Sequence, residues 1–206
     1  MEFVITAGPT REYIDPVRFL SNPSTGKMGF AVARAAAARG HKVTLVAGPV
    51  TLRTPKGVTR IDVGSAREMY DAVRSAITPD CVFVATAAVA DWRPAEFSNR
   101  KKKKTEMSST LRLVRNPDIL KSVDGCVKVG FAAETHDVTE NASRKCREKN
   151  LSMIVANDVT ERGAGFGSDT NRVVLLFPDG RRTPLKKMSK LAVARRIVRE
   201  CESICS

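Results

Sequence analysis

The chain has 206 residues, 42% of them hydrophobic, which is enough to bury a core of ordinary size, and no apolar run approaches the ~20 residues that a membrane span needs. It carries 35 lysines and arginines against 22 aspartates and glutamates, a net charge of +13, which favours either a nucleic-acid partner or small polyanions such as phosphates. Five cysteines without a CxxC spacing and two isolated histidines argue against a disulfide framework and a zinc site.

The predicted elements alternate between strand and helix from the first residues onward. The chain enters an apolar strand directly and shows no signal peptide, so we expect a cytoplasmic protein. Alternation of this kind favours a parallel sheet covered by helices on both faces. Strands are expected at 3–5, 43–46, 60–63, 81–84, 111–114, 127–131 and 153–155, and helices at 26–39, 65–77, from 116, at 137–149 and after 188.

Two helix starts have clear sequence signals, and one hairpin does. Ser65 and Glu68 form a capping box, and Asn116 followed by Pro117 predicts another helix start. Near the end, residues 173–184 read as two strands around a Pro-Asp-Gly turn. We therefore expect a single domain over 1–206: a doubly wound, mostly parallel, Rossmann-like sheet extended by an antiparallel hairpin, with a projecting segment at about 92–115.

Three long polar segments, 6–27, 85–110 and 157–171, follow predicted strands. Ligands of open α/β sheets bind beyond the carboxyl ends of the strands, so these segments should meet on one rim. The first of them opens a helix with the small residues Ser24 to Gly29, where backbone N–H groups could approach a phosphate. An ordinary helix start is the alternative. Neither a P-loop nor a GxGxxG fingerprint is present, because Met28 follows Lys27 and only Gly26 and Gly29 are glycines there.

The other two segments hold weaker candidates. Small residues before Asp91 would let a flat ligand lie against the backbone. Asp91 itself could accept hydrogen bonds from an amino group, hold a metal-bound water, or be only a turn residue. The lysine run 101–104 is either a ligand contact, a solvated loop or a nucleic-acid contact. Glu134 is either a metal ligand or a helix-terminal charge. Lys145 and Lys149 are four residues apart and share one helix face.

Ten short motifs, each weak alone, occur in order along nearly the whole chain. Together they resemble the bacterial phosphopantothenoylcysteine synthetases. The motifs are Ile5–Glu12, Asp15–Arg18, Ser21-Asn22, Ser24–Gly29, Ala87–Asp91, the lysines from Lys101, Asn116–Ile119, Gly130–Thr135, Asn157–Val159 and Phe166–Asp169.

The resemblance implies a ligase of coenzyme A biosynthesis. Its substrates would be CTP, 4'-phosphopantothenate and L-cysteine, joined with Mg2+ assistance through an acyl-cytidylate to give phosphopantothenoylcysteine, CMP and pyrophosphate. The resemblance also implies a homodimer in which the projecting segment of one subunit closes the neighbour's site, and a decarboxylase that is fused or separate. Neither a nucleic acid nor a membrane would be a partner.

The resemblance also assigns roles to residues. Asn22 would hold the acyl-cytidylate, Arg18 lies beside it, and Lys101 would act in the second half-reaction, so these three are the expected catalytic residues. The metal ligands are left open. The nucleotide site would comprise the phosphate cradle and the residues that match the family motifs: Gly8, Ser24, Gly26, Lys27, Ala85, Thr86, Ala87, Asp91, Pro117, Asp118, Ile119, Leu120, Phe131, Lys145 and Lys149.

Two other classes of protein remain as alternatives. A basic α/β protein could bind nucleic acid through Arg100–Lys104 and the final helix, with strong salt dependence. Aromatic residues make up only 5% of the chain, which counts against this alternative. A nicotinamide-dependent reductase would be expected to carry the missing GxGxxG motif.

Overall fold

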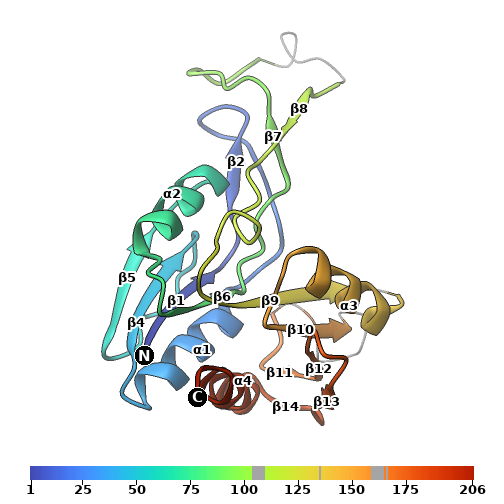
Figure 1. Cartoon of the computed structure of the whole chain (residues 1–206). Coiled ribbons are helices and arrows are strands. Elements are labelled where there is room, and N and C mark those ends of the chain that lie inside the picture. Colours follow the sequence, from blue (N-terminus) through green and yellow to red (C-terminus); the bar gives the residue numbers. More distant parts are fainter. Residues whose placement is uncertain (104–109, 135, 159–164, 166) are drawn as a thin grey trace.

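The structure is a computed structural model that describes residues 1–103, 110–134, 136–158, 165 and 167–206. Its centre is an eight-stranded sheet with the order β13-β12-β10-β9-β6-β1-β4-β5 (Figure 1). The sheet strands are β1 (Glu2–Ala7), β4 (Lys42–Ala47), β5 (Val58–Asp62), β6 (Cys81–Ala85), β9 (Val127–Glu134), β10 (Met153–Asp158), β12 (Val173–Leu176) and β13 (Arg182–Pro184).

The first six of these strands run parallel, and the β12–β13 hairpin adds two antiparallel strands at one edge. The prediction of a doubly wound, mostly parallel sheet extended by a hairpin is therefore confirmed. From β1 the chain winds outward through β4 and β5, then returns to the other side of β1 as β6. The strand order therefore reverses between β1 and β6, and such a reversal is where this kind of sheet binds ligands.

Helices cover both faces of the sheet. They are α1 (Lys27–Ala37), α2 (Ala66–Ala76), α3 (Val138–Glu148) and α4 (Lys190–Cys205). α1 and α4 pack in one apolar cluster, and α2 and α3 pack in the other. The predicted capping box starts α2, since the Ser65 hydroxyl accepts the Glu68 N–H at 3.2 Å. No helix in the described part of the chain has both the length and the apolar character to cross a membrane.

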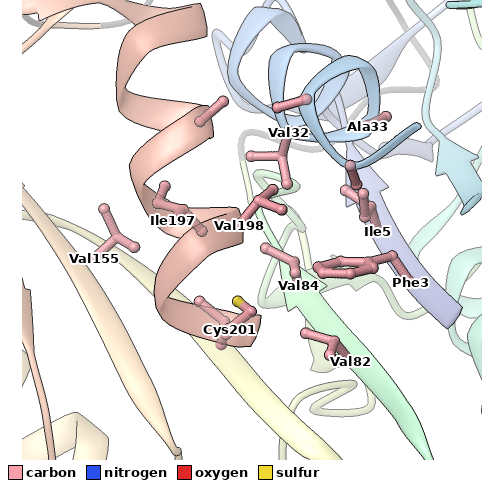
Figure 2. Packing of buried hydrophobic residues seen from close by; sticks show 14 of the residues in the cluster. Phe3, Ile5, Val32, Ala33, Val82, Val84, Val155, Ile197, Val198 and Cys201 are labelled. Atoms are coloured by element: carbon pink, nitrogen blue, oxygen red, sulfur yellow. The ribbon is translucent and has the colours of Figure 1, made fainter. Parts of the chain in front are cut away.

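Successive side chains along a strand belong alternately to the two clusters. Phe3 of β1 lies in the α1/α4 cluster, whereas its neighbour Val4 lies in the α2/α3 cluster. Figure 2 shows Ile197 and Cys201 of α4 facing the strands beside Val84. These side chains have no measurable exposure, so helices seal both faces of the central strands at these positions.

Two short antiparallel pairs rise beyond the sheet and form what we call the arm (Figure 1). One pair is β2 (Arg11–Tyr13) with β3 (Phe19–Ser21), and the other is β7 (Trp92–Pro94) with β8 (Leu113–Arg115). The described residues of the segment predicted to project at about 92–115 include β7 and β8 of the arm. The arm also contains β2 and β3, which sequence patterns did not predict. A last small pair joins β11 (Thr170–Asn171) to β14 (Met188–Ser189).

The helix predicted to start at Asn116 is wrong, because the chain makes only a turn at 119–122. Asn116 does not cap a helix; its side-chain Nδ2 donates to the Ala90 carbonyl at 2.8 Å. Asp118 Oδ1 accepts the Lys121 N–H at 3.1 Å, which closes a single turn. Gly125 then takes a positive φ of 76°, a conformation that does not continue a helix. The side chains of Asn116 and Asp118, which could otherwise cap a helix, make these hydrogen bonds instead.

Asp15 connects the turn between β2 and β3 to Lys102, a residue of the lysine run. Its fully buried carboxylate accepts the backbone N–H groups of Val17 and Arg18, both at 2.9 Å, and the Arg18 guanidinium. The Lys102 N–H also points to it at 3.4 Å, and Arg18 Nη2 donates to the Lys102 carbonyl at 2.8 Å. The bond to Arg18, helped by these N–H groups, holds the pKa of Asp15 well below its usual 3.8.

We expect Asp15→Asn to lower the melting temperature at pH 7 by about 5 °C or more, since a buried ion pair loses one partner. A carboxyl with a depressed pKa contributes stability above its unfolded value of 3.8 and loses it as the pH falls further. The difference in melting temperature between wild type and variant should therefore shrink as the pH is lowered from 6 to 3. A difference that stays constant over this range would show that the Asp15 charge is not what stabilises the turn.

Candidate functional site

A cavity of about 740 Å³ lies at the carboxyl ends of β1, β6 and β9. Residues from all three predicted polar segments line it, including Asn22 to Gly29, Ala85 to Val89, and Asn157. The predicted convergence of these segments on one rim is therefore confirmed for the residues with assigned positions. The cavity occupies the crevice that the reversal between β1 and β6 creates.

The start of α1 forms one wall. Gly26, immediately before the helix, has a φ of 75°, which a residue with a side chain rarely adopts. Gly29 in the first turn lies so close to the sheet that a Cβ atom there would sit 2.4 Å from Thr86 Oγ1 and 2.5 Å from Ala7 Cβ. These two glycines bring the free N–H groups of the helix start down onto the strand ends. A helix start of this kind is a suitable site for an anion.

Hydrogen bonds between the loops after β1 and β6 make a second wall. Thr86 Oγ1 donates to the Thr6 carbonyl at 2.6 Å, and the Ala88 N–H donates to the Gly8 carbonyl at 2.9 Å. The wall from Ala85 to Ala88 exposes backbone and small side chains, as expected for a surface that accepts a flat ring. Since the loops are bonded to each other, this wall is formed before a ligand arrives.

Asn22 stands where the loop before α1 crosses the loop after β6. Its Nδ2 donates to the carbonyl oxygens of Ala88 and Val89 at 3.1 and 3.2 Å. The side chain is exposed and lines the cavity. The carboxamide is thus held by its nitrogen in a fixed position at the rim of the cavity.

α3 and the residue that follows it supply two cations on the face of the sheet opposite α1. Lys149 Nζ lies 2.7 Å from Asp118 Oδ2, and Lys145 Nζ donates to the Phe131 carbonyl at 3.1 Å. Burial would raise the pKa of Asp118, but the bonds from Lys149 and the Lys121 N–H outweigh this effect and leave the pKa lowered. Asp118, just before the turn at 119–122, is therefore attached to the end of α3 by an ion pair between two cavity residues.

Positive charge dominates the cavity. Among the described residues that line it, Lys27, Arg115, Lys145, Lys149 and Lys190 are basic, whereas Asp91 and Asp118 are acidic. Asp118 is already paired with Lys149. A cavity with this excess of cations favours a ligand with several negative charges.

Most of the predicted nucleotide-site residues line this cavity. They are Ser24, Gly26, Lys27, Ala85, Thr86, Ala87, Asp91, Pro117, Asp118, Ile119, Leu120, Phe131, Lys145 and Lys149. Their roles stay predictions. Gly8 lies behind the wall, where its backbone packs against Gly26: a Cβ atom on Gly26 would come within 3.3 Å of Gly8 N.

The structure does not place all three predicted catalytic residues at the cavity. Asn22 lines the cavity, whereas Arg18 and Lys101 belong to the arm and do not. Arg18 is bonded to Asp15 and to the Lys102 carbonyl. Lys101 is exposed and lies in the segment between β7 and β8. Lys104 and Phe166 lie outside the described residues, and so do Thr135 and Val159.

Sequence patterns missed three polar residues of the cavity: Asn171, Lys190 and Arg115. The periodicity of the last helix predicts a buried face that contains Met188 and Leu191, and it gives no indication that Lys190 is buried. One signal was available, because Ser189 caps α4 and a lysine directly after it stands at the positive end of the helix, where cations are disfavoured.

Comparisons with known proteins agree on one family. The family model of the DNA/pantothenate metabolism flavoprotein C-terminal domain matches residues 1–204. A Vibrio vulnificus protein named "Coenzyme A biosynthesis bifunctional protein CoaBC" is 48% identical over 208 residues, covering 98% of this chain and 52% of that protein. A Bacillus subtilis protein of the same name is 50% identical over 206 residues, covering 98% and 51%. The chain thus spans about half the length of these relatives.

Solved structures share the fold. The crystal structure of the C-terminal domain of a coenzyme A biosynthesis bifunctional protein CoaBC superposes with a TM-score of 0.82 at 41% identity, covering 98% of this chain and 94% of the other. A Cab2 mutant in complex with phosphopantothenate-cysteine superposes with a TM-score of 0.77 at 16% identity, covering 98% and 87%. At that identity the second match supports the fold alone.

Proposed function

The chain belongs to the family of the DNA/pantothenate metabolism flavoprotein C-terminal domain, and from this premise we propose that it ligates 4'-phosphopantothenate to L-cysteine in coenzyme A biosynthesis. Its relatives carry the name of a bifunctional coenzyme A biosynthesis protein, and the chain corresponds to about half of their length. The proposal assigns to this half the synthetase reaction.

The observation that carries the proposal is the placement of cations around the cavity. Lys145 and Lys149 reach it from α3 on one face of the sheet, and Lys27 reaches it from α1 on the other. A nucleoside triphosphate and a phosphorylated carboxylic acid would together bring several negative charges to this space. Catalysis would then consist of positioning the two reactants and stabilising charge as it develops.

We propose CTP as the nucleotide. In the first step the carboxylate of 4'-phosphopantothenate attacks the α-phosphorus of CTP, and pyrophosphate leaves. In the second step the cysteine amine attacks the acyl carbon, the bond to CMP breaks, and the amine loses a proton. The backbone at Ala85–Ala87 and the Asp91 carboxylate would contact cytosine and ribose, and Asn22 would contact the acyl-cytidylate.

The donor set of the cavity fits a magnesium ion that is carried mainly by the nucleotide. Within the described ranges, no group of three or more His, Cys, Asp or Glu side chains is placed to hold a metal. Asp91 and Asp118 are the carboxylates that line the cavity, and Asp118 is paired with Lys149. Mg2+ commonly binds through one or two carboxylates together with phosphate oxygens, and would there neutralise charge on the triphosphate.

A second copy of the chain would complete the site. The arm rises beyond the central sheet (Figure 1), and large apolar side chains on it are exposed. They are Tyr13, Val17, Phe19, Trp92, Phe97, Leu111, Leu113 and Val114. Burial of these side chains in a homodimer would bring Lys101 of one subunit to the cavity of the other. A cytoplasmic location and a fused or separate decarboxylase stay predictions of the sequence.

Pyrophosphate release by the purified protein tests the reaction directly. With CTP, Mg2+ and 4'-phosphopantothenate we expect a single turnover of release, and sustained release once cysteine is added. ATP in parallel tests the choice of nucleotide. No release with either nucleotide from a folded protein would reject the ligase. Salt-dependent binding of the same sample to duplex DNA would then support the nucleic-acid alternative.

A further inference from the structure

Lys190 is a buried lysine that no predicted step of the reaction uses. It is the first residue of α4, its side chain is only 8% exposed, and it lines the cavity beside Lys27 and Asn171. Its backbone N–H donates to the Asp169 carbonyl at 3.0 Å. Its ammonium group forms neither a hydrogen bond nor an ion pair with any residue that the structure describes.

Three physical effects make this position unfavourable for a positive charge. Burial removes the ammonium from water, the N-terminal end of α4 carries the positive end of the helix dipole, and Lys27 is a like charge nearby. Burial, and then Lys27, lower the pKa of Lys190, while Asp169 opposes them. An apolar side chain of similar length would fill the same space without these costs. A lysine in this place therefore indicates that an anion binds it in the working protein.

Lys27, the cation near Lys190, is paired with an exposed aspartate, Asp169. Lys27 Nζ lies 2.7 Å from Asp169 Oδ1 and donates to the Gly167 carbonyl at 2.9 Å. The Asp169 side chain is 88% exposed, and exposed ion pairs are weak, so a ligand anion can displace it at little cost. Asn171 Oδ1 is buried without a hydrogen-bond partner in this part of the described chain, and it offers an acceptor to a hydroxyl or N–H group of the same ligand.

We infer that Lys190 and Lys27 form a second phosphate subsite, on the α1/α4 side of the cavity, separate from the Lys145 and Lys149 pair on α3. Asp169 holds Lys27 in place until a phosphate replaces it. This inference rests on the proposed function only for the identity of the ligand, because both 4'-phosphopantothenate and CTP carry phosphate groups. Two separated lysine pairs would hold the two phosphorylated reactants at opposite sides of the same space.

Ligand binding by the full chain tests the subsite with Lys190→Met, and with Lys186→Met as the matched control. Lys186 is exposed, lies four residues away and carries the same charge. Affinities would be measured by calorimetry for 4'-phosphopantothenate, pantothenate, CTP and cytidine. We expect Lys190→Met to weaken binding of one phosphorylated ligand by about tenfold or more, because charge-assisted hydrogen bonds are lost, while its unphosphorylated counterpart is unaffected. The ligand that loses affinity identifies the phosphate. Lys186→Met should change none of the four affinities.

Thermal unfolding separates a ligand-binding lysine from a structural one. Without ligand, Lys190→Met should melt no lower than wild type, and Lys190→Arg should retain phosphate binding. If the methionine variant does not fold, Lys190→Gln takes its place. Equal affinities of wild type and variant for all four ligands would overturn the inference, and so would a parallel loss of melting temperature and of all binding.

Inorganic pyrophosphate distinguishes failure of the subsite from failure of the proposed reaction. If wild type makes no product, but pyrophosphate raises its melting temperature and does not raise that of Lys190→Met, the subsite stands and the ligase does not. An equal rise in both proteins would overturn the subsite whatever the protein synthesises.

Discussion

Asn22→Asp is expected to lower the rate of product formation by about a hundredfold while leaving the fold intact. The Asn22 amide donates to the carbonyl oxygens of Ala88 and Val89, and an aspartate cannot donate to either. The new carboxylate would instead be repelled by both oxygens and by the anionic acyl-cytidylate. Because the side chain is exposed, its burial contributes little to stability. Pyrophosphate release and product formation measure the effect.

Asn150→Asp is the control for this substitution. It makes the same chemical change at an exposed residue after α3, whose φ of 50° asparagine and aspartate both tolerate. The control should retain wild-type turnover, and both variants should melt within about 2 °C of wild type. Normal turnover in Asn22→Asp would remove Asn22 from the site. A large fall in its melting temperature would mean that the hydrogen bonds hold the two loops together rather than position a ligand.

Lys101→Gln is expected to slow capture of the acyl-cytidylate by cysteine by about a hundredfold, with a smaller effect on pyrophosphate release. Lys101 does not line the cavity of its own chain, so under the proposed arrangement a second copy would have to bring it to the reactants. Rapid quenching with and without cysteine separates the two steps. Equal loss in both would assign Lys101 to nucleotide binding instead.

Mixing the two inactive proteins tests whether the site is shared between subunits. In a heterodimer of Asn22→Asp and Lys101→Gln, one shared site contains both substitutions and the other contains neither. After random exchange, half of the dimers are mixed, so about a quarter of wild-type activity should return. No recovery, with subunit exchange verified independently, would place Asn22 and Lys101 in the same subunit's site and reject the proposed arrangement.

The elements that were predicted correctly are those whose residues show a local pattern, either a continuous apolar run or a helix cap. The strands at 3–5, 81–84 and 153–155 are continuous apolar runs because both faces of the sheet are covered. α2 was predicted from its capping box, which requires only residues three apart. These signals are local, and nothing elsewhere in the structure competes with them.

The parts that were missed depend on contacts between distant segments. Asn116 has a good helix-starting sequence, but its side chain is bonded to Ala90, 26 residues away. β2 and β3 have three residues each and include exposed side chains, so they show no pattern of burial. Lys190 begins a helix whose buried face was predicted, yet its placement involves a distant segment, because its N–H donates to the Asp169 carbonyl and the preceding Ser189 pairs with Thr170. Sequence patterns could place the cavity but not its full set of charges.

The position of α4 has a consequence for how the protein is made. The helix comes last in the chain, yet Val198 and Cys201 share a cluster with Phe3 and Val32 from its beginning (Figure 2). When the strands and α1 have been synthesised but residues 190–205 have not, the part of this sheet face that α4 covers is still exposed. Exposed apolar strands are prone to associate with other chains, so we expect the domain to aggregate more readily before α4 has packed than after it.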